Sequence, residues 1–170
     1  VSIQILRSNF TDYYEEEDGG AIRIINCGIK CNNTIFIDCT SNKGGGGGIY
    51  IKNNRSTNKN VTLIDLFFLR CKSNYGGAAY VYCSNEESRI LVQNCSFKSN
   101  EALQKTDVYQ NNLFGGAALF LSSLNIVINN SVFEYNKGKG GVKISTEFDE
   151  NDKVIKQLEQ TSFNGLITIV

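Results

Sequence analysis

A glycine pair followed by a short apolar run recurs along this chain, and no other feature restricts the fold as strongly. The copies read GGAIRI at 19–24, GGIYI at 47–51, GGAAYVY at 76–82, GGAALFL at 115–121 and GGVKI at 140–144. Their second glycines stand at positions 20, 48, 77, 116 and 141, so successive copies are 28, 29, 39 and 25 residues apart. Recurrence at such lengths is typical of solenoids and propellers, in which each copy is one supersecondary unit.

A second motif precedes the later copies. It is an aromatic residue or a cysteine three positions before an asparagine, and it reads CTSN at 39–42, CKSN at 71–74, FKSN at 97–100 and FEYN at 133–136. Apolar runs suited to β-strands stand before it, such as RILV at 89–92. These units are mostly too short for four-stranded propeller blades. The sequence therefore predicts an all-β parallel β-helix (solenoid) of about five to six coils, with loop inserts, forming a single domain over 1–170.

Coils that stack about 4.8 Å apart place equivalent residues in columns. The repeated asparagines would then form a ladder in which each amide bonds to the next coil. Its expected members are Asn42, Asn74, Asn100 and Asn136. The same alignment puts Cys39 on Cys71, and Phe97 on Phe133, inside one corner.

Alternation along the strands predicts which side chains face the interior. In GGIYIK, Ile49 and Ile51 point to one side of the strand and Tyr50 points to the other. Counting from Gly20 in the first coil instead puts Arg23 inside. The first coil is therefore expected to be shifted by one residue or distorted.

The pairing of GGA(I/A/L) with FxxN resembles the repeats of the chlamydial polymorphic outer-membrane proteins, and similar repeats occur in large surface proteins of some protists. The resemblance covers roughly residues 5–170. It implies a right-handed parallel β-helix displayed outside the cell and used for adhesion or as a structural stalk. This chain departs from the pattern in two corners, where cysteine is expected in place of phenylalanine, and in inserted loops at 52–61 and 101–114.

The six cysteines include no CxxC pair, and the chain has no histidine to complete a zinc site. Disulfides in an oxidising compartment are the favoured interpretation, with free thiols as the alternative. Stacking in one column predicts a Cys39–Cys71 bond, since the two Cα atoms would lie within disulfide range. The local pairs Cys27–Cys31 and Cys83–Cys95 would remain.

Six glycosylation sequons indicate an extracellular or cell-surface protein, although an asparagine-rich chain also produces sequons by composition. They lie at Asn9, Asn32, Asn54, Asn60, Asn94 and Asn129. Asn54 and Asn60 are in the most polar insert and are expected to be the most accessible, whereas Asn94 is the doubtful site. Lys plus Arg and Asp plus Glu both number 17, so no basic field favours nucleic acid, and no stretch resembles a membrane span.

No catalytic, cofactor-binding or metal-binding residue is predicted. The five-glycine run KGGGGGIY lacks the GK(S/T) ending of a phosphate loop. Acidic runs at 15–18 and 148–153 either hold Ca²⁺ or form solvated loops. Turn residues with acid–base or charged side chains do not recur as a cluster; they are Asp38, Asp65, Arg70 and Lys72. A structural or adhesive module without enzymatic activity is the preferred function, and a carbohydrate-binding or polysaccharide-degrading β-helix is the alternative.

Both ends of the chain read as bare strands, SIQIL at 2–6 and GLITIV at 165–170. Such ends favour end-to-end stacking, either with more of the same chain or with a second copy in a homo-oligomer. The residues expected at the junction are Ile3, Ile5, Ile167 and Ile169. A glycan or a host-surface ligand is a further expected partner, and a nucleic acid is not.

Overall fold

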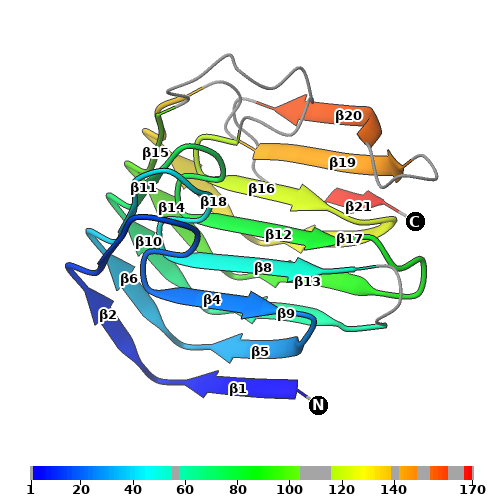
Figure 1. The fold of residues 1–170 in the computed structure, drawn as a ribbon, viewed down its shortest axis with the longest axis horizontal. Coiled ribbons are helices and arrows are strands. Elements are labelled where there is room, and N and C mark those ends of the chain that lie inside the picture. Colours follow the sequence, from blue (N-terminus) through cyan, green and yellow to red (C-terminus); the bar gives the residue numbers. More distant parts are fainter. Residues whose placement is uncertain are drawn as a thin grey trace.

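The computed structural model describes residues 2–54, 58–103 and 116–138 in full, together with the backbone of 142–148, 154–160 and 167–169. Every regular element in this part of the chain is a β-strand. The strands stack in layers, from β1 at one end to β19 and β20 near the other (Figure 1). Each complete turn of the chain adds one strand to each of four sheets.

The first two sheets contain the strands that open each turn. The first sheet consists of β1 (Ser2–Leu6), β5 (Gly28–Asn32), β9 (Val61–Ile64), β13 (Arg89–Gln93), β17 (Asn125–Asn129) and β21 (Ile167–Ile169). The second sheet consists of β2 (Asn9–Thr11), β6 (Ile35–Ile37), β10 (Phe67–Leu69), β14 (Ser96–Lys98) and β18 (Val132–Glu134).

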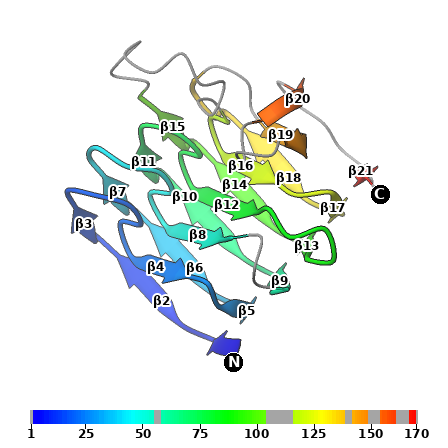
Figure 2. The same ribbon diagram turned by 45° about the vertical axis from the view of Figure 1, so that its right-hand side comes forward.

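The other two sheets complete each turn. The third sheet consists of the short strands β3 (Tyr14–Glu15), β7 (Thr40–Ser41), β11 (Lys72–Ser73) and β15 (Glu101–Ala102). The fourth consists of β4 (Ile22–Ile25), β8 (Ile49–Asn53), β12 (Ala79–Cys83), β16 (Leu119–Ser122), β19 (Val142–Phe148) and β20 (Val154–Gln160). Figure 2 shows the successive turns lying side by side as a solenoid.

Neighbouring strands are parallel except at the C-terminal end, where β20 pairs antiparallel with β19 and β21 antiparallel with β17. Three complete turns, β1–β4, β5–β8 and β9–β12, are each described from their first strand to their last, and residues 55–57 between the second and the third lie outside the description. The description of the next turn omits 104–115, and the third sheet has no strand beyond β15 among the described residues. Within the described residues the solenoid thus has about three complete turns, fewer than the predicted five to six coils, and the antiparallel strands β20 and β21 add no parallel turn.

The bends on either side of the second sheet are made by single residues in the left-handed backbone region. One column, at the bend after the first sheet, has φ between 48° and 53° and contains Arg7, Asn33, Asp65, Asn94 and Asn130. The other, at the bend before the third sheet, has φ between 53° and 59° and contains Asp12, Asp38, Arg70, Ser99 and Tyr135. Asn and Asp tolerate this conformation better than other non-glycine residues, which explains their frequency here. Asp38, Asp65 and Arg70 are therefore residues of these bends.

The interior is built from columns of equivalent apolar residues. In the first sheet one column contains Ile3, Ile29, Val61, Ile90 and Ile126. In the second sheet the phenylalanine rings stack face to face with centroids 4.7–5.0 Å apart, in the order Phe10, Phe36, Phe68, Phe97 and Phe133. The spacing of the rings equals the spacing of hydrogen-bonded strands, so backbone pairing and side-chain packing stabilise the same register.

The strand register corrects the alignment of the glycine motif. Ile22 pairs with Ile49, and in the following turns the same position is held by Ala79 and Leu119. Three residues earlier lies a column of glycines with φ between 58° and 75°: Gly19, Gly46, Gly76 and Gly116. In two copies, the glycine that was taken as the second of the pair, Gly48 or Gly116, therefore lies one residue away from the position equivalent to Gly20.

The corrected frame also removes the anomaly expected in the first coil. Arg23 lies opposite Tyr50, and its side chain is 56% exposed, so it points outward. Of the two expectations for the first coil, the one-residue shift is confirmed, because Gly20 lies in register with Gly47 and not with Gly48, whereas the strand itself pairs regularly. The shift arose because the alignment used a different glycine in each copy.

Candidate functional site

A buried polar ladder runs through the corner between the second and third sheets. Asn100 and Asn136 occupy equivalent positions in successive turns, one residue before the paired Glu101 and Lys137. The Nδ2 of Asn100 donates to the Oδ1 of Asn136 at 3.0 Å, and the backbone N of Asn100 donates to the same oxygen at 2.9 Å. One turn earlier, the backbone N of Cys71 donates to the Oδ1 of Asn100 at 2.9 Å. The ladder thus joins three turns through side-chain amides.

The other two predicted members of the asparagine ladder lie elsewhere. Asn42 donates to the carboxylate of Glu16 at 3.2 Å, and Asn74 donates to the carbonyl of Lys43 at 2.6 Å. A single column of Asn42, Asn74, Asn100 and Asn136 is therefore a wrong prediction.

The physical reason is the register of the second sheet. Phe36 pairs with Phe68 and Phe68 pairs with Phe97, so Cys39 and Cys71, three residues further on, correspond to Asn100. Cysteine replaces the asparagine of FxxN in these turns, and not the phenylalanine as predicted.

Cys39 and Cys71 lie on each other in this column. The backbone N of Lys72 donates to the carbonyl of Cys39 at 2.9 Å, and Lys72 pairs with Thr40, which places the two cysteines in register. Both side chains are 0% exposed. The Cys71 thiol lowers the pKa of Cys39, while its interaction with Cys39 and its burial raise the pKa of Cys71. None of the six cysteines forms a disulfide in this structure.

The two predicted local pairs do not fit the strand geometry. Cys27 and Cys31 are four residues apart along extended β5, which separates their Cα atoms by about 13 Å. The five residues of β13 lie between Cys83 and Cys95, a span of about 16 Å. A disulfide needs Cα atoms roughly 4.4–6.8 Å apart. The pairs Cys27–Cys31 and Cys83–Cys95 are therefore incompatible with this fold.

The remaining cysteines pack in or against the apolar core, and two of them also bond to the side chain of Asn53. Cys31 lies in an interior column between Ile5 and Leu63. The Nδ2 of Asn53 donates to the Sγ of Cys83 at 3.6 Å, and the Oδ1 of Asn53 accepts from the backbone N of Cys27 at 2.9 Å. Burial raises the pKa of Cys31 to about 11, and those of Cys83 and Cys95 to about 12. These three thiols remain protonated near neutral pH, which makes them poor nucleophiles.

The N-terminal end of the solenoid presents an uncovered cross-section. The four strands of the first turn, β1 to β4, are edge strands of the four sheets (Figure 1). Ile3 is 39% exposed, whereas Ile29 in the next turn of the same column is 2% exposed. Ile5 and Phe10 are partly buried and pack against the main core. Apolar columns thus reach the surface at this end.

The predicted C-terminal junction residues lie in β21. Ile167 pairs with Ile128 and Ile169 pairs with Ile126, so both stand in register with interior columns of the first sheet. The strand nevertheless runs antiparallel to β17. The two ends of the solenoid therefore differ in strand direction.

The predicted turn charges form pairs between successive turns. Arg70 donates two hydrogen bonds to the carboxylate of Asp38, at 2.7 and 2.6 Å, and this lowers the pKa of Asp38. Lys72 lies 3.9 Å from the carboxylate of Glu101. Asp65 accepts from the Nδ2 of Asn94 at 3.1 Å. Each group is engaged by a neighbouring turn, so their arrangement follows the stacking of the coils.

The glycine run at 44–48 is accounted for by close packing. A methyl group at Gly45 would lie 2.3 Å from the Tyr75 ring, and one at Gly44 would lie 2.4 Å from the Asp18 carboxylate. That carboxylate accepts from the backbone N of Gly45 at 3.0 Å and from the Tyr75 hydroxyl at 3.4 Å. The run therefore lets one loop lie directly against the next.

The described surface has a cavity of about 690 Å³ beside β1 and β5. It is lined by Gln4, Leu6, Arg7, Lys30, Asn32, Asn33 and Asp65. Its walls combine amide and charged groups with one apolar side chain. This chemistry offers hydrogen-bond donors and acceptors for a polar ligand.

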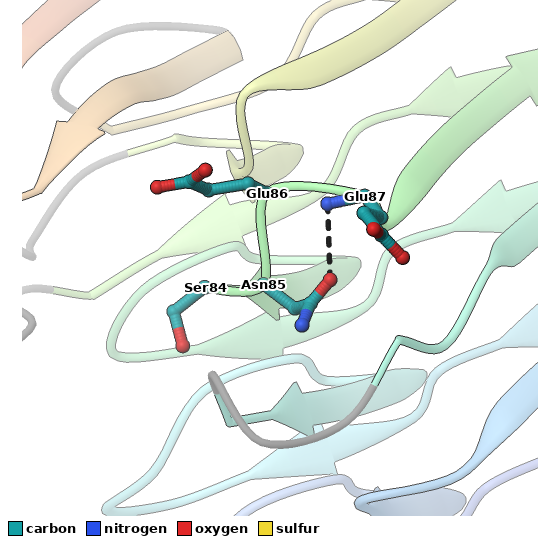
Figure 3. Close-up of a pocket in the computed structure, with 4 residues that line it drawn as sticks. All are labelled: Ser84, Asn85, Glu86 and Glu87. Atoms are coloured by element: carbon teal, nitrogen blue, oxygen red, sulfur yellow. Dashed lines mark hydrogen bonds between the residues drawn. The ribbon is translucent and has the colours of Figure 1, made fainter.

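A second cavity, of about 380 Å³, lies at the loop between β12 and β13 (Figure 3). Its lining residues are Ser84, Asn85, Glu86 and Glu87. Figure 3 shows the carboxylates of Glu86 and Glu87 pointing in different directions, with the backbone N of Glu87 donating to the Oδ1 of Asn85 at 3.0 Å. These two carboxylates do not form an acid–base pair across the cavity.

The acidic run at 15–18 borders a third cavity, of about 560 Å³, together with Arg23. Hydrogen bonds from Tyr14, Asn42 and Lys43 lower the pKa of Glu16 to about 2. Within the described part of the chain, no three acidic or thiol side chains converge as metal ligands. The side chains of the second acidic run, at 148–153, lie outside the described residues.

The predicted glycosylation sites differ in exposure. Asn9, Asn54, Asn60 and Asn94 are exposed, whereas Asn32 and Asn129 are half-buried. The sequon hydroxyls of Thr34 and Ser131, which follow the half-buried sites, are fully buried. In the structure, four of the six predicted positions are therefore exposed at the surface.

No protein-family model matches this chain, and no curated protein or solved structure matches it either. The strand order and the interior columns define the class directly: the protein is an all-β chain of parallel sheets stacked as a β-solenoid. The described residues include no helix that is long and apolar enough to span a membrane.

Proposed function

We propose that this chain is a structural or adhesive module of an extracellular or cell-surface assembly, in which right-handed β-solenoid coils stack end to end as a stalk or fibre. The observation that carries the proposal is the uncovered N-terminal cross-section, where Ile3 is 39% exposed although its column is buried in the next turn. The resemblance of the GGA and FxxN motifs to repeats of surface proteins supports the location.

The N-terminal end has the chemistry of an unfinished stack. The edge strands β1 to β4 offer backbone hydrogen-bonding groups, and Ile3, Ile5 and Phe10 offer apolar contact. A further β-coil in register satisfies both needs, because it pairs with the strand edges and covers the columns. This coil comes from more of the same chain or from a second copy of it, and in the second case contacts that repeat without closing build a fibre.

Sedimentation of the 170-residue chain over a wide range of concentrations tests this assembly. The expected result is a series of species that grows beyond the dimer. Ile3→Glu should abolish this growth, because it places a charge on the apolar cross-section. A matched control is Leu6→Glu in the same strand, since Leu6 is 51% exposed and pairs in register with Asn32 rather than with an interior residue. The control should associate like the parent chain.

A chain that stays monomeric at every concentration, or stops at the dimer, would contradict the fibre. Equal effects of Ile3→Glu and Leu6→Glu would show that the association does not use the cross-section. Circular dichroism of each variant, with a retained β spectrum, separates loss of assembly from loss of fold.

Carbohydrate binding is a second candidate function, and the cavity of about 690 Å³ beside β1 and β5 favours it. Amide and charged groups of Gln4, Asn32 and Lys30 are suited to sugar hydroxyls. A polysaccharide-cleaving variant of this function needs two facing carboxyl groups about 5–10 Å apart, and Asp65 is the one carboxyl group lining this described cavity. Calorimetric titration with oligosaccharides tests binding, and Lys30→Ala should weaken it.

A further inference from the structure

The column that contains Cys39 and Cys71 changes its chemistry along the solenoid. In the later turns the position is occupied by Asn100 and Asn136, whose amides bond across the turns at 3.0 Å. In the earlier turns the equivalent positions hold two thiols. The same corner is therefore joined by amide hydrogen bonds at one place and occupied by a sulfur pair at another.

We propose that Cys39 and Cys71 form a disulfide that joins the second and third turns and takes the place of the amide ladder there. In-register parallel strands hold equivalent Cα atoms about 4.8 Å apart, within the roughly 4.4–6.8 Å that a disulfide requires. The Sγ of Cys71 lies 3.7 Å from the carbonyl oxygen of Phe36, which belongs to the same turn as Cys39. The inference rests on the fold alone and not on the proposed function.

The geometry also restricts the pairing to these two residues. Cys31 and Cys95 face other interior columns, and Cys83 contacts the amide of Asn53. Cys27 lies about 13 Å from Cys31 along the strand. The disulfide consequently leaves four of the six cysteines as thiols.

The bond forms by thiol–disulfide exchange with a small disulfide such as oxidised glutathione. The thiolate of Cys39 attacks one sulfur of the oxidant and releases one glutathione thiolate. The thiolate of Cys71 then attacks the Cys39 sulfur of the mixed disulfide and releases the second. Two protein thiols are oxidised, one small disulfide is reduced to two thiols, and the protein thiol protons pass to solvent.

Burial determines when this exchange takes place. Both side chains are 0% exposed in the folded chain, so the oxidant reaches them before the third turn packs on the second or during its opening. Once the turns have packed, the same burial protects the bond from reductants. The disulfide is therefore expected to resist mild reduction until the protein unfolds.

Refolding of the full chain in a glutathione redox buffer, followed by alkylation and non-reducing peptide mapping, tests the proposal. The expected result is one Cys39–Cys71 link and four alkylated cysteines. Cys31→Ser, which removes another buried thiol, should leave the link unchanged. Cys39→Ser should leave Cys71 alkylated and create no other link. Six alkylated cysteines in the folded chain, or Cys39 linked to any other residue, would overturn the proposal.

The double variant Cys39→Asn/Cys71→Asn provides a second test. It should fold without a cross-link, because it continues the amide ladder seen at Asn100 and Asn136. A strong reductant should lower the midpoint of thermal unfolding of the parent chain and leave that of the double variant unchanged. An equal response of the two proteins would contradict the disulfide, and mapping of the parent chain decides the question even if the double variant fails to fold.

Discussion

Asn100 and Asn136 stack on successive turns, with the Nδ2 of Asn100 donating to the Oδ1 of Asn136 at 3.0 Å. Asn100 is fully buried, and its Nδ2 also donates to the carbonyl of Phe68 at 3.2 Å. Its Oδ1 accepts from the backbone of Cys71. One amide therefore satisfies polar groups on three turns, in a corner that would otherwise bury them without partners.

Asn100→Ala is expected to lower the free energy of unfolding by about 2 to 4 kcal/mol, because it leaves buried backbone groups of Cys71 and Phe68 without their partner. Urea unfolding measures the change. Asn42→Ala is the control, since the Asn42 amide bonds to Glu16 near the surface, and its effect should stay within about 1 kcal/mol. Equal losses in the two variants would contradict the central role of the ladder.

The phenylalanine stack predicts that the loss of stability on removing a ring depends on where the ring lies in the solenoid. Phe68→Ala removes a fully buried ring that stacks on Phe36 at 4.7 Å and on Phe97 at 4.9 Å, and it should cost about 3 to 5 kcal/mol. Phe10→Ala should cost clearly less, because Phe10 is partly buried at the uncovered end and stacks on Phe36 alone. Chemical denaturation of both variants checks the order, and a larger cost at Phe10 would contradict it.

Stacked parallel strands could be predicted from the sequence because glycine pairs and apolar runs recur every 25 to 39 residues. The direction of Ile49, Ile51 and Tyr50 followed from alternation alone. These features depend on local periodicity, which a single chain displays directly.

The alignment of the cysteine-containing copies with the FxxN motif could not be found from local periodicity. FIDC at 36–39 and CTSN at 39–42 overlap, and cysteine is small and apolar enough to stand for either phenylalanine or a buried asparagine. Only the pairing of Phe68 with Phe97 decides between them. The antiparallel direction of β20 and β21 likewise depends on contacts between distant strands, which no local pattern specifies.

The left-handed bends were also missed, although a signal was present. Asn33, Asp65, Asn94 and Asn130 each follow a strand of the first sheet by one residue, and such residues tolerate positive φ. Arg7 and Tyr135 hold equivalent conformations without this tolerance. Composition alone therefore marks four of the five residues in one column and two of the five in the other.

Gly45→Ala should destabilise the protein through a specific clash with the Tyr75 ring, at a cost of about 1 to 3 kcal/mol. A double-mutant cycle with Tyr75→Ser measures the coupling, because removal of the ring makes space for the methyl group. The cost of Gly45→Ala should be smaller in the Tyr75→Ser background. Additive effects would show that the glycine is required for another reason.

Glycosylation is expected to follow exposure. In a eukaryotic secretory host, Asn54 and Asn60 should be occupied, whereas the half-buried Asn32 and Asn129 should be poorly occupied. Intact-mass analysis before and after glycosidase treatment measures the total, and Asn54→Gln and Asn60→Gln should each remove one glycan. Asn32→Gln is the matched control and should leave the mass shift unchanged. A chain that carries no glycan at Asn54 and Asn60 after secretion would contradict this assignment.

The lowered pKa of Glu16 predicts that the folded protein loses stability in acid. Hydrogen bonds from Tyr14, Asn42 and Lys43 hold its pKa at about 2 in the folded chain, below the value of 4.5 for an unperturbed glutamate. A carboxyl group whose folded pKa is lowered contributes stability above its unfolded pKa, and this contribution is lost as the pH falls toward the folded pKa. The difference in unfolding free energy between the parent chain and Glu16→Gln should therefore be constant near neutral pH and shrink between about pH 4.5 and pH 2. Urea unfolding across this range measures it, and high salt should reduce the effect because the group is exposed. A difference that does not change with pH would show that Glu16 acts through neutral hydrogen bonding and not through its charge.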